Sequence, residues 1–115
     1  MRLRLTYRPV PFTIHLMYTV EFTDGVSEDL KALRATDRKR ILDKIDEQLL
    51  HSPTRPTRNK KIVVGLKPPW EQEEPVWELR VGRFRVFYDV NETEQRVVIR
   101  AVREKPSHRT TEEIL

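Results

Sequence analysis

The chain has 115 residues and a mass of 13.8 kDa, which suffices for one domain with one core. It contains no cysteine, which excludes disulfides, thiolate metal sites and a cysteine nucleophile and agrees with the cytoplasmic location that we expect. The net charge of +4 and the pI near 9.6 favour either a polyanionic partner or simple solubility. No apolar run approaches the roughly 20 residues of a membrane span, so no membrane contact is expected.

Residues 1–16 form a predicted N-terminal extension, separate from a single domain that spans residues 17–115. The extension lacks a consistent hydrophobic period, and Pro9 and Pro11 argue against a helix or a central strand. It carries no small-residue cleavage site, so we do not expect a signal peptide. Two interpretations remain open: translation begins at Met17, or the extension is a loosely attached arm.

The first predicted element of the domain is a short strand, because Tyr18, Val20 and Phe22 alternate with polar residues. Ser27 suits the N-cap of a first helix, which we expect to run to about Arg34. Acidic residues follow Ser27 directly and would stabilise the first turn of that helix.

A second helix is predicted from Thr36, its expected N-cap, to the Ser52-Pro53 pair that ends it. Its apolar residues recur at three- and four-residue spacing and form one stripe: Ile41, Leu42, Ile45 and Leu49. We expect the two helices to form a hairpin that covers one face of a sheet. The solvent-facing side of this hairpin should carry Lys39, Arg40 and Lys44.

Residues 53–67 carry positive charge and no acidic residue. Their basic residues are Arg55, Arg58, Lys60, Lys61 and Lys67. The first half of this segment is predicted as a loop and residues 62–66 as a strand. The local charge suits either a solvated loop or contact with phosphates. The acidic, proline-bounded segment 68–75 that follows is interpreted as a loop that balances this charge.

Residues 76–90 contain two alternating runs whose phase shifts by one residue at Gly82-Arg83. A two-residue Gly-X connection suits a type II′ turn and predicts a β-hairpin. The predicted register sets three apolar pairs opposite each other: Val81 and Phe84, Leu79 and Val86, and Trp77 and Tyr88. We expect this face to pack on the helices at Leu30, Leu33, Ile41, Ile45 and Leu49.

The other face of the hairpin places Arg80 directly across from Arg85. Like charges about 5 Å apart cost about 1 to 4 kcal/mol per pair before salt screening. Either these long side chains splay into solvent, or they bind a polyanion together with Arg83 in the adjacent turn.

A second hairpin, with a four-residue loop at residues 91–94, would pair Val90 with Gln95. The same register would set Arg85 against Arg100, which predicts a row of three arginines on one face of the sheet. A row of this kind favours an anion site over solvated arginines.

The tail contains Thr110 with Glu113 three residues later, a capping-box pattern that predicts a short terminal helix. His108 lies just ahead of it and is either an inert exposed side chain or an acid/base group near the arginine row. The three histidines of the chain have no metal-ligand spacing, so no metal and no cofactor are expected.

The order of these elements, together with Trp77-Glu78-Leu79-Arg80 and Phe84-Arg85-Val86-Phe87-Tyr88, resembles the RelE/ParE superfamily of bacterial type II toxins. The resemblance covers residues 17–115. It implies an α+β fold in which an N-terminal strand and a helical hairpin pack on one face of a four- to five-stranded, mainly antiparallel sheet, with a short C-terminal helix. The RelE branch cuts mRNA in the ribosomal A site without a metal, and the ParE branch poisons DNA gyrase.

Residue by residue, the resemblance matches Arg85 to the RelE-branch arginine that contacts the scissile phosphate region. RelE-like enzymes place lysines where this chain has Val76 and Glu78, and no tyrosine follows Tyr88. Other ribonuclease branches of the superfamily use a C-terminal histidine or a glutamate as base, so the resemblance makes His108 and Glu78 the candidates for a general base. The predicted catalytic residues are Arg80, Arg85, Glu78 and His108. The predicted RNA contacts are Arg58, Lys60, Lys61, Arg83, Arg100 and Lys105.

These observations predict the toxin of a type II toxin–antitoxin module, a metal-independent, ribosome-dependent mRNA endoribonuclease that inhibits translation. The expected partners are a cognate antitoxin protein, the ribosome and mRNA. Two alternatives stay open: a ParE-like inhibitor whose partner is DNA gyrase, and a catalytically silent member of the family that binds only the antitoxin.

Overall fold

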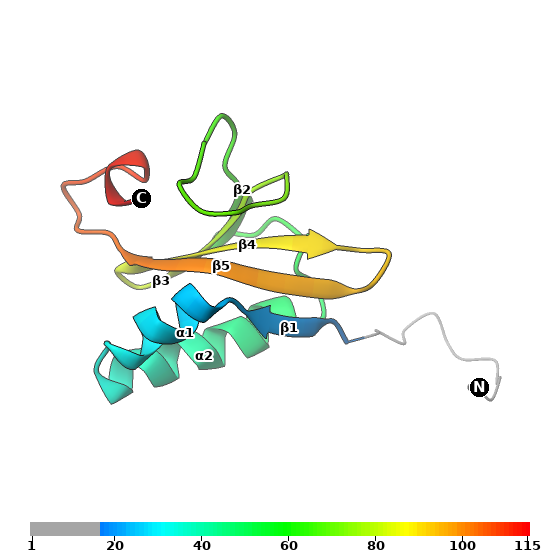
Figure 1. Cartoon of the computed structure of the whole chain (residues 1–115), viewed down its shortest axis with the longest axis horizontal. Helices are drawn as coiled ribbons and strands as arrows, with labels where there is room; N and C mark the ends of the chain where they lie inside the picture. The colour runs from blue at the N-terminus through cyan, green and yellow to red at the C-terminus, as the bar shows by residue number, and fades with distance from the viewer. Residues whose placement is uncertain (1–16) are drawn as a thin grey trace, which may run out of the picture.

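Two helices lie against one face of a five-stranded sheet in the computed structural model, which describes residues 17–115 (Figure 1). The elements are β1 (Thr19–Phe22), α1 (Asp24–Lys31), α2 (Ala35–Leu49), β2 (Lys60–Ile62), β3 (Trp77–Val81), β4 (Phe84–Asn91), β5 (Arg96–Glu104) and a 3-10 turn, η1 (Glu112–Ile114). The strand order is β1-β5-β4-β3-β2. Strand β1 runs parallel to β5, and the other neighbours are antiparallel. The predicted α+β fold is therefore confirmed, whereas the predicted extension 1–16 lies outside the described residues.

The β3–β4 hairpin has the predicted register. Val81 pairs with Phe84, Arg80 with Arg85, and the two strands stay in this register to Trp77 and Tyr88. Gly82 has a φ of 58°, which a side-chain-bearing residue adopts only with strain. A Cβ at this position would also lie 2.8 Å from Arg40 Nη1.

The main core lies between the helices and the sheet. Its buried members are Val26, Leu30, Ile41, Ile45, Leu49, Trp77, Leu79, Val81, Phe84, Val86, Tyr88, Val97, Ile99 and Val102, with Leu33 partly buried beside them. Trp77 stacks on Tyr88 with ring centroids 6.0 Å apart. The Tyr88 hydroxyl donates to the Pro53 carbonyl at 2.7 Å, and burial raises the pKa of Tyr88. The predicted packing of the hairpin on the helical stripe is confirmed.

Both helices begin earlier than the sequence pattern predicted. Thr23, and not Ser27, caps α1, because Thr23 Oγ1 accepts a hydrogen bond from the Val26 amide at 3.3 Å and Val26 is then fully buried. Helix α2 begins at Ala35, so the predicted Thr36 cap is also wrong. The connection between the helices is stabilised by Arg38, whose guanidinium donates to the Leu30 and Leu33 carbonyls.

The predicted register of β5 is wrong by two residues at the loop and by three residues beyond a bulge farther along the strand. Val90 pairs with Val97 rather than Gln95, because Gln95 takes a left-handed conformation within the loop, with a φ of 53°. Farther along, Tyr88 pairs with Ile99 and Phe87 with Ala101, which leaves Arg100 as the extra residue of a β-bulge. Arg85 consequently faces Arg103, and the predicted Arg85–Arg100 pair does not exist.

The second face of the sheet is partly covered by loops. The predicted strand at residues 62–66 is instead β2 at Lys60–Ile62, and the chain then crosses the sheet so that Trp70 lies 5.3 Å from Phe87 between ring centroids. Gln72 Nε2 donates to the Tyr88 carbonyl at 3.1 Å. The acidic segment is therefore a packed cover as well as a carrier of charge. A small group of apolar residues lies between the sheet and these loops and is called here the second apolar cluster. Its buried members are Leu66, Val76, Phe87 and Ala101, and Val63, Trp70, Ile114 and Leu115 flank them.

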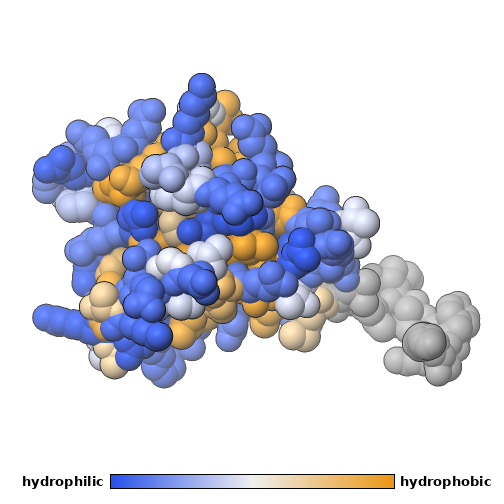
Figure 2. Space-filling model, in the orientation of Figure 1, coloured by the Kyte–Doolittle hydropathy of each residue, from blue (hydrophilic) through white to orange (hydrophobic). Residues whose placement is uncertain are grey.

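The two faces of the sheet thus have different covers, with the helices on one side and the loops with the C-terminal turn on the other (Figure 1). Hydrophilic side chains dominate the surface turned to the viewer in Figure 2, and apolar residues show between them in small patches. No helix within residues 17–115 combines the length and apolarity needed to cross a membrane.

Truncation of one buried core side chain is predicted to lower the stability of the fold strongly. Leu79→Ala should lower the free energy of unfolding by about 2 to 5 kcal/mol, because Leu79 is fully buried and the smaller alanine side chain would leave a cavity in the core. Val64→Ala is the matched control: Val64 is 90% exposed, so the change should stay within about 0.5 kcal/mol. Urea unfolding of both variants checks this, and a loss below about 1 kcal/mol for Leu79→Ala would contradict the packing of β3.

Candidate functional site

A pocket of about 160 Å³ opens on the loop-covered side of the sheet. It is lined by Arg58, Asn59, Lys61, Glu78, Arg80, Arg85, Lys105 and Thr111. These residues come from β2 and the loop before it, from β3 and β4, and from the C-terminal segment. The predicted site residues Arg58, Lys61, Glu78, Arg80, Arg85 and Lys105 therefore do converge, although they are far apart in the sequence.

Arg85 forms the floor of this pocket on β4. It is only 6% exposed, and its Nη1 donates to the carbonyls of Gly82 at 2.9 Å and Phe84 at 2.8 Å. Burial lowers the pKa of Arg85, and the charge of Arg80 across the hairpin lowers it further. An arginine nevertheless stays protonated at neutral pH. The guanidinium is therefore a fixed charge that is held in a defined orientation.

Within the described residues, no carboxylate directly contacts the guanidinium of Arg80 or Arg85. Among residues 17–115, neither guanidinium forms a salt bridge. Glu78 lies close enough to favour the charged form of Arg85, but Arg80 acts in the opposite direction. Two neighbouring cations without a counter-ion make this position favourable for an anion.

Glu78 brings a carboxylate into the same pocket. It is 4% exposed, and β-sheet pairing sets it between Lys61 on β2 and Phe87 on β4. Its Oε2 accepts a hydrogen bond from Thr111 Oγ1 at 3.2 Å, and its Oε1 lies 3.9 Å from Lys61 Nζ. The pocket therefore combines an acceptor for protons with several donors for an anion.

Lys60 was predicted to contact RNA, and the structure places it on the opposite side of β2. It is 2% exposed, and its Nζ donates to the carbonyls of Gln48 at 2.8 Å and Ser52 at 2.6 Å, where α2 ends. Burial lowers the pKa of Lys60, and nearby Arg55 adds to that effect. Successive strand residues point to opposite faces, so Lys61 lines the pocket and Lys60 closes the end of a helix.

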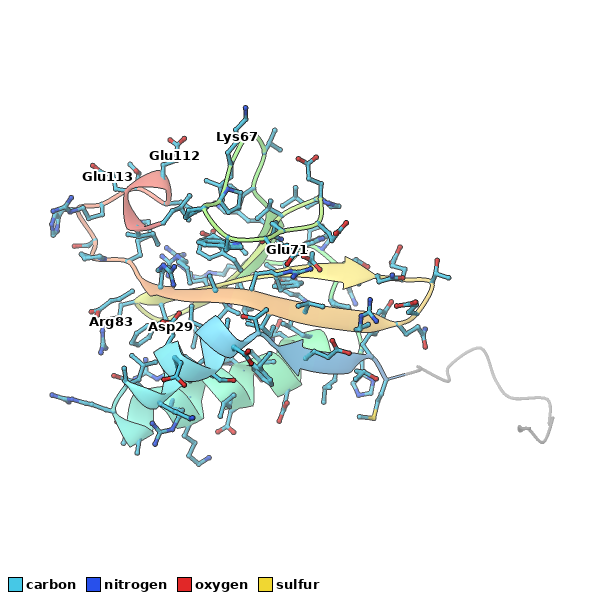
Figure 3. All side chains as sticks on the ribbon, viewed as in Figure 1. Asp29, Lys67, Glu71, Arg83, Glu112 and Glu113 are labelled. Carbon is cyan, nitrogen blue, oxygen red and sulfur yellow. The ribbon has the colours of Figure 1, made fainter. Side chains whose placement is uncertain are left out.

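Arg83 and Arg100 also lie outside the pocket. Arg83 bonds to Asp37 and Glu104, each at 2.8 Å, and its hydrogen bond to Glu104 raises its pKa. Figure 3 shows Arg83 at the end of the sheet, beside the helix layer. Arg100 is paired with Asp89 at 2.6 Å. Both guanidiniums are paired with carboxylates of the chain outside the pocket, and their RNA-contact role stays a prediction.

Arg103 takes the position across from Arg85 that Arg100 was expected to hold. Its Nη1 lies 3.0 Å from Asp29 Oδ2, and its guanidinium carbon lies 5.2 Å from the centroid of the Trp70 ring. The arginine row therefore exists, but its third member is neutralised by contacts within the chain. Only Arg80 and Arg85 carry uncompensated charge in the row.

His108 does not line the pocket. It is exposed in the connection between Lys105 and Thr111, both of which do line it. Asn59 and Thr111 are pocket residues that the sequence reasoning missed. The capping-box pattern predicted the turn that carries Thr111, but it gave no signal for a contact with Glu78. Within residues 17–115, no three His, Cys, Asp or Glu side chains are arranged to hold a metal ion.

A family model described as "ParE toxin of type II toxin-antitoxin system, parDE" matches residues 20–105. A search of curated proteins finds no match. Among solved structures, the RelBE2 toxin–antitoxin complex of Mycobacterium tuberculosis aligns with a TM-score of 0.61 at 23% identity, covering 78% of this chain and 93% of that one.

Two further solved structures have the same fold. The RelE–RelB complex of Pyrococcus horikoshii OT3 aligns with a TM-score of 0.60 at 21% identity, over 82% of this chain and 99% of that one. The isolated E. coli RelE toxin gives a TM-score of 0.60 at 18% identity, over 82% and 88%. At these identities the likeness establishes the architecture alone.

Substitution of the two adjacent lysines on β2 should distinguish a charge that stabilises the fold from one that binds an anion. Lys60→Met should lower the free energy of unfolding by about 1 to 3 kcal/mol, because two carbonyls at the end of α2 lose their donor. Lys61→Met should change stability by less than about 0.5 kcal/mol, since Lys61 is exposed.

The affinity of the two variants for heparin, a generic polyanion, should change in the opposite order to their stability. Lys61→Met should weaken it and Lys60→Met should not. Equal stability of Lys60→Met and the wild-type protein would contradict the buried contacts of Lys60.

Proposed function

The chain belongs to the ParE toxin family of type II toxin–antitoxin systems, and we propose that it inhibits translation as a ribosome-dependent mRNA endoribonuclease. The observation that carries this proposal is the pocket itself, which gathers Arg80, Arg85 and Lys61 around the carboxylate of Glu78. Cleavage of RNA by its own 2′-hydroxyl needs a base and stabilisation of a phosphate that gains negative charge. Both are present within one site of about 160 Å³.

In the proposed reaction, Glu78 removes the proton from a ribose 2′-hydroxyl, and that oxygen attacks the adjacent phosphorus. The bond between phosphorus and the 5′-oxygen breaks, which leaves a 2′,3′-cyclic phosphate on one fragment. The departing 5′-oxygen takes a proton from an ammonium group, and Lys61 and Lys105, which both line the pocket, are the candidates for this donor. Each proton and each bond is thereby accounted for by groups of this chain and the substrate.

Arg80 and Arg85 stabilise the phosphate during this step. Their guanidiniums offer several N–H donors in a planar arrangement that matches phosphate oxygens. Arg85 is already oriented by two carbonyls, so little reorganisation accompanies the reaction. The anion also relieves the repulsion between the two arginines, which is stronger in the free protein.

His108, the other candidate base, is not part of this mechanism because it does not line the pocket. The requirement for a 2′-hydroxyl makes the activity specific for RNA. An antitoxin protein is the expected partner in the cell, and the RelBE and RelE–RelB complexes among the structural neighbours support this expectation. We expect the antitoxin to cover the arginine side of the sheet and to exclude RNA from it.

A second candidate function is inhibition of DNA gyrase, which the description of the matching family as ParE favours. Gyrase inhibition requires no buried carboxylate beside the arginines, so the geometry of Glu78 supports it less than RNA cleavage. The two functions give opposite results in simple assays, because one acts on mRNA and the other on DNA supercoiling.

The proposal is tested by mapping cleavage sites on mRNA with and without ribosomes. We expect cuts only when ribosomes are present, and Arg80→Ala should reduce them by about 100-fold or more. Because Arg80 is exposed and repels Arg85, its removal should leave the melting temperature unchanged or slightly raised. Exposed Arg34→Ala serves as a control for loss of one positive charge. Inhibition of gyrase supercoiling by a wild-type protein that cuts no mRNA would favour the second function.

The two candidate bases give a separate prediction. Glu78→Gln should reduce the cleavage rate by about 100- to 10,000-fold, because the amide cannot accept the 2′-hydroxyl proton. His108→Gln should keep the rate within about threefold of wild type, since the imidazole lies outside the pocket. Single-turnover kinetics on ribosome-bound mRNA measures both. Loss of cleavage in His108→Gln with ribosome binding retained would move the base from Glu78 to the imidazole.

A further inference from the structure

The C-terminal segment reaches back over the sheet and contacts the side chain of Glu78. Thr111 Oγ1 donates to Glu78 Oε2 at 3.2 Å, and Thr111 lines the same pocket. The other carboxylate oxygen, Oε1, lies 3.9 Å from Lys61 Nζ. The two oxygens are therefore in different environments, because one is bonded to a neutral hydroxyl and the other lies near an ammonium group.

Thr111 is held in place from both sides. The Thr110 amide donates to Glu113 Oε1 at 2.7 Å, and the Glu113 amide donates to Thr110 Oγ1 at 3.3 Å. This reciprocal pair is the predicted capping box, and it fixes the turn at its start. At the end of the turn, Ile114 and Leu115 pack against the second apolar cluster. The hydroxyl of Thr111 consequently has a defined position above the sheet.

We propose that Thr111 is the positioning residue for Glu78: its hydroxyl holds Oε2, so that Oε1 is the oxygen that receives the 2′-hydroxyl proton. This inference rests on the proposed ribonuclease function. A glutamate side chain has three rotatable bonds, and one hydrogen bond to a fixed donor selects among its orientations.

Neighbouring threonines in the tail thus have separate tasks. The Thr110 hydroxyl accepts a hydrogen bond from the Glu113 amide within the turn, whereas the Thr111 hydroxyl donates to Glu78 on β3. The apolar residues that follow act as the anchor of the segment. The tail is therefore part of the site wall, and its contribution to the reaction passes through one hydrogen bond.

Thr111→Val tests this role, because it removes the hydroxyl and keeps the shape of the side chain. The expected result is a kcat about 10- to 100-fold lower with KM nearly unchanged, since a misplaced base slows the chemical step and leaves RNA binding intact. Thr111→Ser should restore most of kcat, because it returns the hydroxyl donor.

Glu112→Gln is the matched control beside it. Glu112 is exposed, and Figure 3 shows it on the side of the turn away from the sheet. This variant should keep the wild-type kcat and KM. Urea unfolding of all variants separates a loss of the tail contact from a loss of folding. The ¹³C resonance of the Glu78 carboxyl should shift in Thr111→Val and return in Thr111→Ser.

Different outcomes overturn different claims. If the wild-type protein cuts RNA and Thr111→Val does so with the same kcat, the positioning role is wrong and the hydroxyl only anchors the tail. A Thr111→Ser variant as slow as Thr111→Val also overturns it, because the donor alone is then insufficient. If the wild-type protein cuts no RNA with ribosomes, the proposed function fails first and the role of Thr111 in the reaction falls with it.

Discussion

The structure depends on the register of the β3–β4 hairpin, which the two-residue turn at Gly82 fixes. Because side chains alternate along a strand, one register decides both faces at once. Leu79 and Val86 meet on the helix side and form the core, and Arg80 meets Arg85 on the other side. A shift by one residue would move the apolar core residues to the other face and turn both arginines toward the helices. The free energy of folding therefore maintains the geometry of the pocket indirectly, through apolar packing on the opposite face.

This coupling explains how the fold tolerates two uncompensated cations. Arg80 and Arg85 repel each other, and burial of Arg85 adds a further cost, which its lowered pKa expresses. Two carbonyl acceptors satisfy the buried guanidinium but supply no full negative charge. The packing of the helices on the sheet must outweigh this local cost. A functional site that is unfavourable in the free protein is then ready to gain from an anion.

Other cations of the chain are used differently, and their partners show it. Lys60 closes the end of α2, Arg83 joins α2 to the hairpin, and Arg103 joins α1 to β5. Arg100 holds Asp89, whose carboxylate also accepts the Glu73 amide and so attaches the covering loop to the sheet. Structural cations are thus paired with carboxylates or carbonyls within the chain, whereas those around Glu78 largely face the pocket.

Local patterns in the sequence determined the hairpin, the helical stripe and the capping box, because period, turn chemistry and caps act over a few neighbouring residues. They also placed Arg80 and Arg85 on one face. The tertiary structure alone decided the rest. A left-handed Gln95 and a bulge at Arg100 replaced Arg100 by Arg103 in the row, and no local pattern encodes either feature.

The same limit applies to the pocket walls. Lys60 and Lys61 are adjacent and chemically alike. Only the pairing of β2 with β3 decides that Lys60 reaches the end of α2 and that Lys61 lines the pocket. Thr111 meets Glu78 because the tail folds back over the sheet, a contact between residues 33 positions apart in the chain. A sequence pattern contains the spacing of residues along one element, whereas these contacts depend on how separate elements pack against each other.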